Sequence, residues 1–147
     1  MFHLRSLILG TCAAALMAGS VAAKSDITVA MQLEPPHLDP TSAAAGAIDS
    51  VLYSNVFEGL TRFMGDGSVV PGLAESWEIS DDGLTYTFKL HSGVTFHDGT
   101  TMDADDVKFS LDRINADDSA NAQKALFSAI SEVKVLDPTT VEIKLSE

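Results

Sequence analysis

The sequence is poor in basic side chains. Its 147 residues include 9 lysines and arginines against 21 aspartates and glutamates, which gives a formal net charge of −12. A protein that binds nucleic acid needs a basic face to neutralise phosphates, so this charge argues against nucleic acid as a partner. It argues equally against adsorption to an anionic membrane surface. The length fits one soluble domain or a piece of a larger protein.

The amino-terminal segment differs from the rest of the chain. Residues 1–5 carry one positive charge and no acidic side chain, and residues 7–19 are apolar or small throughout. Residues 21–23 supply the small side chains that a signal peptidase requires at its cleavage site. This pattern predicts a secretory signal peptide over residues 1–23, cleaved before Lys24.

Two alternatives to a cleaved signal peptide are a membrane anchor and lipid attachment at Cys12, the single cysteine of the chain. A membrane anchor would need about 20 apolar residues, whereas the run at residues 7–19 has thirteen. Lipid attachment at Cys12 would need a small residue just before it, where Thr11 stands. Without residues 1–23 the chain has 124 residues, a net charge of −13 and no cysteine. It therefore depends on a hydrophobic core and not on disulfides.

Hydropathy patterns along the mature chain predict a mixed α/β (α+β) fold. The apolar run at residues 27–31 is too short for a helix and predicts a buried strand. Three prolines keep residues 34–40 out of helix and sheet. Apolar residues at spacings of three and four predict a helix over residues 47–58, ended by Gly59. The later expected elements are a strand at 60–63, a hairpin of strands 77–80 and 84–90, a short strand at 94–96, helices over 103–115 and 119–130, and a hairpin with strands around 133–135 and 141–145.

Turn and cap residues support two of these boundaries. The Asp-Asp-Gly sequence at residues 81–83 supplies the positive φ that a tight hairpin turn requires. Asp103 can cap the helix that follows it, and Asp105 and Asp106 favour the positive end of that helix. In the strand at residues 84–90 apolar and polar side chains alternate, so we expect one buried face and one solvated face.

Side chains that could carry catalysis are few. Acid pairs occur at 81–82, 105–106 and 117–118. Each pair lies in a turn or in the first turn of a helix, where carboxylates have a structural role. His91, His97 and Asp98 could share a metal ion in a secreted metal-dependent hydrolase, but no His-Glu-x-x-His motif accompanies them. The mature chain also lacks a thiol nucleophile and a nucleotide-binding loop. We therefore expect no enzyme activity, no metal and no cofactor.

Candidate ligand-binding residues follow the first expected strand. Gln32, Leu33 and Glu34 lie at its exit, and ligands of α/β sheets gather outside the carboxyl ends of strands. The Glu34 carboxylate could accept from an ammonium group while the neighbouring backbone pairs with an extended ligand. A solvated loop glutamate is the alternative. Trp77, the sole tryptophan, could stack on a ligand, but its place in a strand favours a core role.

Five ordered motifs resemble those of one family. The signature region extends over residues 73–90 and continues in residues 93–99 and 105–110. Leu-Asp-Pro at residues 38–40 and Val-Phe-Glu-Gly-Leu at residues 56–60 precede it in the same order. Together they resemble the family 5 extracytoplasmic solute-binding proteins, which are periplasmic oligopeptide, dipeptide and nickel receptors of ABC importers.

The resemblance implies a type II periplasmic binding protein fold, in which two lobes close on a ligand. It implies that residues 24–56 begin lobe I, that residues 57–147 build its extra subdomain, and that the second lobe and most of the pocket follow Glu147. Glu34 matches a glutamate of the peptide-binding members. Pro35 and Pro36 depart from the commoner pattern there, and because proline has no N–H to donate they argue against main-chain pairing with the ligand at these two positions.

The function implied by the resemblance is solute binding without chemistry. We expect a monomeric periplasmic receptor that binds a di- or oligopeptide and delivers it to an inner-membrane permease, with no direct membrane insertion once the signal is removed. Receptors of the same fold for nickel chelate, oligosaccharide or haem are the alternatives.

Overall fold

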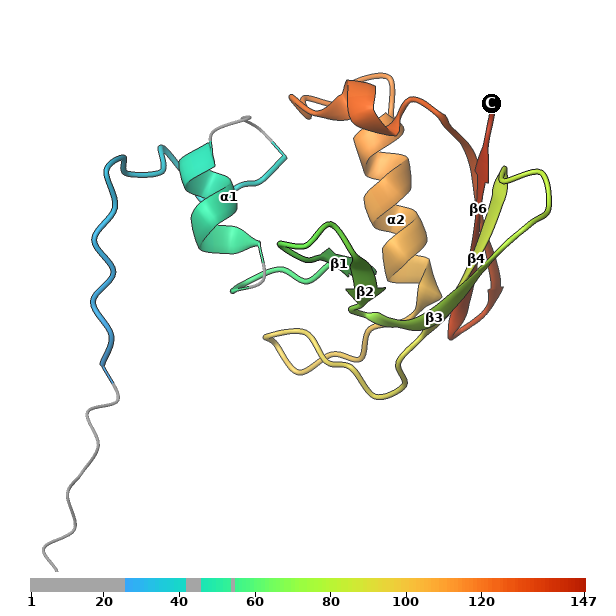
Figure 1. The fold of residues 1–147 in the computed structure, drawn as a ribbon, viewed down its shortest axis with the longest axis horizontal. Helices are drawn as coiled ribbons and strands as arrows, with labels where there is room; N and C mark the ends of the chain where they lie inside the picture. The colour runs from blue at the N-terminus through green and yellow to red at the C-terminus, as the bar shows by residue number, and fades with distance from the viewer. Residues whose placement is uncertain (1–25, 42–45, 54) are drawn as a thin grey trace, which may run out of the picture. The chain divides into compact units, whose positions relative to one another are not determined.

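A computed structural model describes residues 26–41, 46–53 and 55–147 of the chain (Figure 1). The chain divides into two units, residues 1–30 and residues 31–147, which are treated separately. The predicted signal peptide, with Cys12, lies outside the described residues. Within the described residues no helix is long and apolar enough to cross a membrane.

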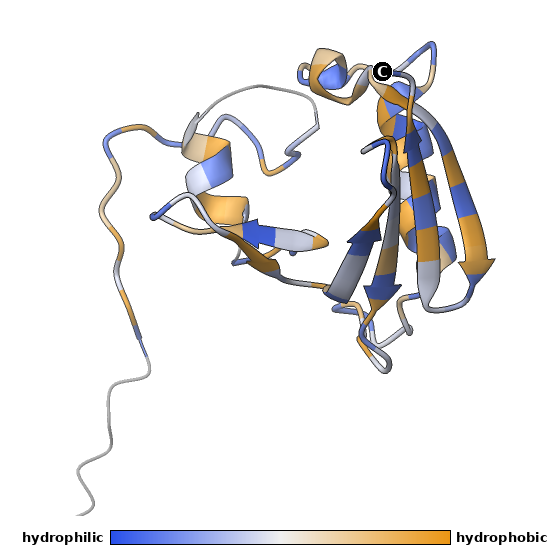
Figure 2. Cartoon of the chain, turned by 45° about the vertical axis from the view of Figure 1, so that its right-hand side comes forward, coloured by the Kyte–Doolittle hydropathy of each residue, from blue (hydrophilic) through white to orange (hydrophobic). Residues whose placement is uncertain are grey.

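An antiparallel sheet of four strands dominates the second unit. Its strands are β3 (Ala74–Ile79), β4 (Thr85–Leu90), β5 (Ile130–Asp137) and β6 (Thr140–Leu145), in the spatial order β3-β4-β6-β5. Apolar and polar residues alternate along the strands (Figure 2). Both predicted hairpins are confirmed, and Gly83 adopts the expected positive φ of 73° in the first of them.

Helix α2 (Ala104–Asn115) covers part of the apolar face of this sheet. Its predicted cap is confirmed: an Asp103 side-chain oxygen accepts from the backbone N–H of Asp105 at 2.9 Å, and Asp106 accepts from the backbone N–H of Asp103 at 2.9 Å. Val107 of α2 packs into the same core as Val133, Val141 and Ile143 of the sheet.

Three short elements precede the sheet, and one follows α2. They are α1 (Gly46–Leu52), β1 (Thr61–Phe63), β2 (Val69–Pro71) and the 3₁₀ helix η1 (Lys124–Phe127). Strands β1 and β2 pair with each other in an antiparallel hairpin. Ile48 and Leu52 are the buried residues of α1, in agreement with the expected apolar stripe.

The predicted helix over residues 47–58 is too long, because the chain turns after Leu52. The backbone N–H of Phe57 donates to the Leu52 carbonyl at 3.0 Å, a bond five residues back that departs from the regular helical pattern. Val56 is consequently exposed instead of buried. Ser54 lies outside the described residues.

Three other expected elements are also wrong. The predicted strand at residues 27–31 has no regular structure and is exposed, because no described strand pairs with it. The strand at residues 94–96 is reduced to one bridge between Thr95 and Thr101. The helix predicted over residues 119–130 is only η1, because Ile130 pairs with Leu145 and joins β5.

The capping box predicts a local loss of helix stability when Asp103 is removed. We expect Asp103→Ala to destabilise the first turn of α2 by about 1 kcal/mol, which corresponds to an increase of about fivefold in amide exchange. Hydrogen exchange of the α2 amides measures this change. Asp117→Ala, in the exposed loop after α2, is the control, and equal effects of the two substitutions would contradict the capping role.

Candidate functional site

A hollow of about 490 Å³ lies at the carboxyl-terminal end of α2. Its walls come from the Leu-Asp-Pro loop, from Phe57, from α2 and from the loop that follows α2. The lining residues are Asp39, Thr41, Phe57, Phe109, Ser110, Arg113, Ile114, Ala116, Asp118, Ser119, Ala120 and Asn121. The hollow thus combines two aromatic rings with carboxylates of two loops and one guanidinium group.

A backbone hydrogen bond links the two loops that line this hollow. The N–H of Ala122 donates to the Thr41 carbonyl at 3.2 Å. Asn121 supports the second loop, because its side-chain oxygen accepts from the backbone N–H of Gln123 at 2.8 Å. These bonds hold polar side chains that are distant in sequence around one space.

The Asp39 carboxylate is fixed by its own loop. One of its oxygens accepts from the Thr41 hydroxyl at 2.7 Å and from the Thr41 backbone N–H at 2.8 Å. The Thr41 side chain and then its N–H lower the pKa of Asp39 below the ordinary 3.8, and the charge of Arg113 adds to this effect. Asp39 is therefore an anion at neutral pH.

Arg113 supplies the positive charge of the hollow. It lies in the last turn of α2, where a cation is favoured by the negative end of the helix dipole. With Asp39 and Asp118 on the opposite loops, it makes a site of mixed charge. Such a site can bind a solute that carries both an ammonium and a carboxylate group.

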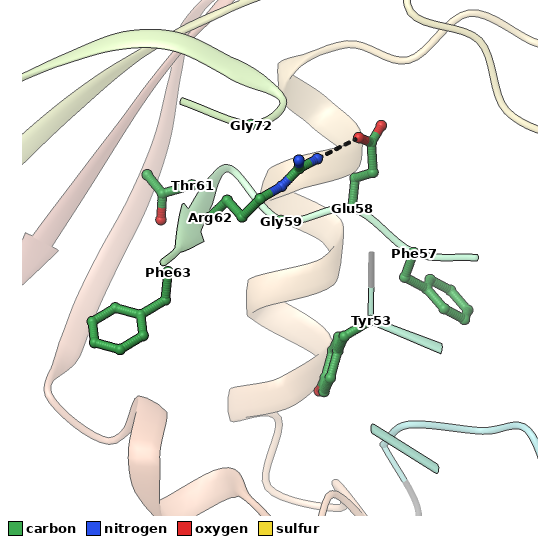
Figure 3. A pocket seen from close by; sticks show the side chains of 8 residues that line it. All are labelled: Tyr53, Phe57, Glu58, Gly59, Thr61, Arg62, Phe63 and Gly72. Carbon is green, nitrogen blue, oxygen red and sulfur yellow. Dashed lines mark ion pairs between the residues drawn. The ribbon is translucent and has the colours of Figure 1, made fainter. Parts of the chain in front are cut away.

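A second hollow, of about 380 Å³, lies on residues 53–72 and shares Phe57 with the first (Figure 3). Tyr53, Phe57 and Phe63 contribute rings to it. Arg62 and Glu58 form an ion pair at 3.6 Å across its rim. Because its only cation already has a carboxylate partner, this hollow offers less to a charged solute than the hollow at α2 does.

The three binding residues predicted from the sequence do not line either hollow. Gln32, Leu33 and Glu34 are exposed and lie in the irregular segment before Pro35. A role for them in ligand binding stays a prediction. The sequence pattern showed no site signal for Arg113 and placed Asp118 only in a turn. The Leu-Asp-Pro motif at residues 38–40 contributed only to the family resemblance, although its loop forms one wall of the hollow.

The other candidate residues have structural partners. Asp82 and Asp98 accept hydrogen bonds from residues of their own turns, and Asp106 belongs to the capping box. No group of three potential metal ligands occurs among the described residues, so the geometry gives no support to a metal site at His91, His97 and Asp98. Trp77 is half-buried and packs on Phe88, with ring centroids 6.3 Å apart.

Comparison with known proteins places these features in a family. The profile of the bacterial extracellular solute-binding proteins, family 5 (middle region), matches residues 68–147. The glutathione-binding protein GsiB of Escherichia coli (strain K12) is 40% identical over 150 residues, which cover 99% of this chain and 28% of that protein. The chain therefore spans little more than a quarter of the length of this relative.

Solved structures give the same result for the fold. NikZ from Campylobacter jejuni in complex with Ni(L-His) matches with a TM-score of 0.67 and 36% identity, over 77% of this chain and 22% of that one. AppA from Bacillus subtilis in complex with a nonapeptide matches with a TM-score of 0.70 and 28% identity, also over 77% and 22%. These neighbours are bilobal type II periplasmic binding proteins, and the mixed α/β chain corresponds to a fragment of that fold.

The Asp39 loop yields a test by titration. We expect Thr41→Val to raise the pKa of Asp39 toward 3.8, because the substitution removes the hydroxyl that contributes most to lowering it. A lowered pKa stabilises the folded state at pH values above the pKa that Asp39 has in the unfolded chain. This contribution is lost as the pH falls through the folded-state pKa, so the variant should lose less of its stability in acid than the parent. Carboxyl ¹³C NMR measures the pKa.

Thr100→Val is the matched control for this titration. Thr100 makes the same pair of bonds to Asp98, so its substitution should raise the pKa of Asp98 and leave that of Asp39 unchanged. An unchanged pKa of Asp39 in the Thr41→Val variant would contradict the assigned cause.

Proposed function

Because this chain belongs to the family 5 bacterial extracellular solute-binding proteins, we propose that it is part of a periplasmic receptor that delivers a small solute to an ABC permease of the inner membrane. Proteins of this family bind solutes for transport and are not enzymes. Export through the predicted signal peptide over residues 1–23 is consistent with this location. The receptor would act by closing two lobes on its ligand.

The ligand that we propose is a short peptide. The observation that carries this proposal is the mixed charge of the hollow at α2, which Arg113, Asp39 and Asp118 all line. A short peptide carries both an ammonium and a carboxylate group, so it can pair with both signs of charge. The similarity to a glutathione-binding protein and to a receptor solved with a nonapeptide supports the same class of ligand.

A nickel chelate is the second candidate. The similarity to NikZ, which is 36% identical and was solved with Ni(L-His), supports this candidate. A metal chelated by an amino acid also presents carboxylate groups that Arg113 could bind.

Glu34 extends the proposed site toward the amino terminus of the peptide. The side chain is exposed and follows a segment that has no partner strand among the described residues. We propose that Gln32, Leu33 and Glu34 belong to the ligand site of the full-length lobe. Glu34 would then accept from the ammonium group of the peptide.

Calorimetry on the full-length receptor tests the class of ligand. Titration with glutathione, with dipeptides and with longer peptides should give saturable heat for at least one of them. The nickel–histidine complex is titrated in parallel. Saturable binding of that complex, with no heat from any peptide, would replace the peptide assignment by the chelate.

Substitution of the two arginines decides between the two hollows. Arg113→Gln should weaken binding of the identified ligand at least about tenfold, or 1.4 kcal/mol, because it removes the cation of the first hollow. Arg62→Gln removes the cation of the second hollow and should leave affinity within about twofold, because the proposed ligand binds in the other hollow. A larger loss with Arg62→Gln would move the site to the hollow of Figure 3.

Glu34 has a separate test that uses the ligand as its own control. Glu34→Gln should weaken binding of a peptide with a free amino terminus by about tenfold, the effect of removing a charge-assisted hydrogen bond. The amino-acetylated form of the same peptide should bind the parent and the variant alike. Equal losses for both peptides, or no loss for either, would exclude the ammonium contact.

A further inference from the structure

The end of α2 and the loop that follows it bring hydrogen-bond donors to the first hollow. Arg113 of the helix and Ser119 and Asn121 of the loop all line it. Ser119 and Asn121 are half-buried, whereas Arg113 is exposed. A donor that is removed from water needs an acceptor. What these groups offer a ligand therefore depends on which of their atoms the fold already uses.

The Asn121 carboxamide has one end fixed by the protein. The backbone N–H of Gln123 donates to this group at 2.8 Å, and only the carboxamide oxygen can accept such a bond. The amide nitrogen, with its two donor hydrogens, is therefore the other end of the group. No described residue accepts a hydrogen bond from that nitrogen. The loop thus holds Asn121 with its donor end available to a ligand.

Ser119 and Arg113 also have donors that the fold does not use. The Ser119 oxygen accepts from the backbone N–H of Asn121 at 3.3 Å, which leaves its own O–H able to donate. The Arg113 guanidinium group interacts with the charge of Asp39, but it makes no hydrogen bond within the part of the chain that the structure describes. Three donor groups, one of them a cation, therefore border the same space.

The acceptors of the hollow are carboxylates. One oxygen of Asp39 takes both hydrogen bonds from Thr41, so the other oxygen can accept from a ligand. Asp118 lies on the same loop as Asn121 but is exposed, and solvent and salt screen an exposed charge. A ligand carboxylate, which accepts up to about four hydrogen bonds, complements the donors. An ammonium group complements the Asp39 loop.

We propose that Ser119 and Asn121 join Arg113 in binding the terminal carboxylate of the peptide, and that Asn121 determines specificity for this charged end. The inference rests on the proposed function, which names a peptide but not its direction in the hollow. The carboxyl end lies at the loop after α2, and the amino end lies toward the Asp39 loop. Because hydrogen bonds to a charged acceptor are the stronger ones, a peptide that ends in an uncharged carboxamide binds less tightly.

The substitution Asn121→Asp tests this assignment, because it replaces the donor nitrogen by an oxygen and keeps the oxygen that supports Gln123. The probes for calorimetry on the full-length receptor are trialanine and trialanine amide, since a site that binds the ends of a peptide requires no particular side chain. Asn121→Asp should weaken trialanine binding at least about thirtyfold, because two carboxylates then face each other. Binding of the amide should change by less than about threefold.

Gln123→Glu is the matched control. It adds the same negative charge to the same loop, at a residue that does not line the hollow. Trialanine should bind this variant within about threefold of the parent, because a charge outside the hollow is screened. Should Asn121→Asp fail to fold, Ser119→Ala makes the same comparison, with an expected loss of about tenfold for trialanine and little loss for the amide.

The possible failures separate this inference from the proposed function. Equal losses for both probes would assign Asn121 to a main-chain group of the peptide and overturn its role at the carboxylate. Full affinity for trialanine in Asn121→Asp, together with a loss in Arg113→Gln, would exclude Asn121 and leave the proposed function intact. Failure of the parent to bind trialanine, or full affinity in Arg113→Gln as well, would remove the peptide site from this hollow and the inference with it.

Discussion

The four-stranded sheet has an apolar face that must be shielded from water, and this constraint determines the rest of the structure. Val141 and Ile143 can leave water only if a helix lies over them, and Val107 of α2 meets them in the common core. The position of α2 is further fixed by Lys108, whose ammonium group donates to the Val133 carbonyl at 3.0 Å and to the Asp112 carboxylate at 2.7 Å. Hydrophobic burial thus places the helix, and polar contacts along its side set its register.

The candidate binding hollow is a consequence of that placement. Once α2 is held on the sheet, its carboxyl-terminal turn carries Arg113 to the level of the Leu-Asp-Pro loop. The bond between Ala122 and Thr41 then joins that loop to the segment after the helix. Val107 in the core and Arg113 at the hollow therefore lie on the same helix. A shift of α2 on the sheet would change the arrangement of charges around the hollow.

Part of the acidity of the chain has a local explanation. Five aspartates accept hydrogen bonds within their own turns, and these bonds lower the pKa of each; they are Asp39, Asp66, Asp82, Asp98 and Asp137. The main donor is the residue two positions later, except that the pKa of Asp82 is lowered first by the Ser80 hydroxyl and then by the Leu84 N–H. Such carboxylates stabilise turns and do not form a common anionic surface for a ligand. The net charge of −12 therefore argues against nucleic acid and anionic membranes as partners but does not identify a ligand. Arg113, the one cation that lines the hollow, says more about the ligand than the many carboxylates do.

The sequence by itself determined the elements whose signals are local. The turn at Gly83, the cap at Asp103 and the alternating strands of both hairpins follow from interactions between residues a few positions apart, and the family follows from ordered motifs. Tertiary structure decided the rest, because the deciding partners are distant in sequence. Ile130 joined a strand instead of a helix because Leu145 pairs with it, and residues 27–31 stayed irregular because no described strand pairs with them. Arg113 entered the hollow only because α2 packs on the sheet, a contact that no local pattern encodes.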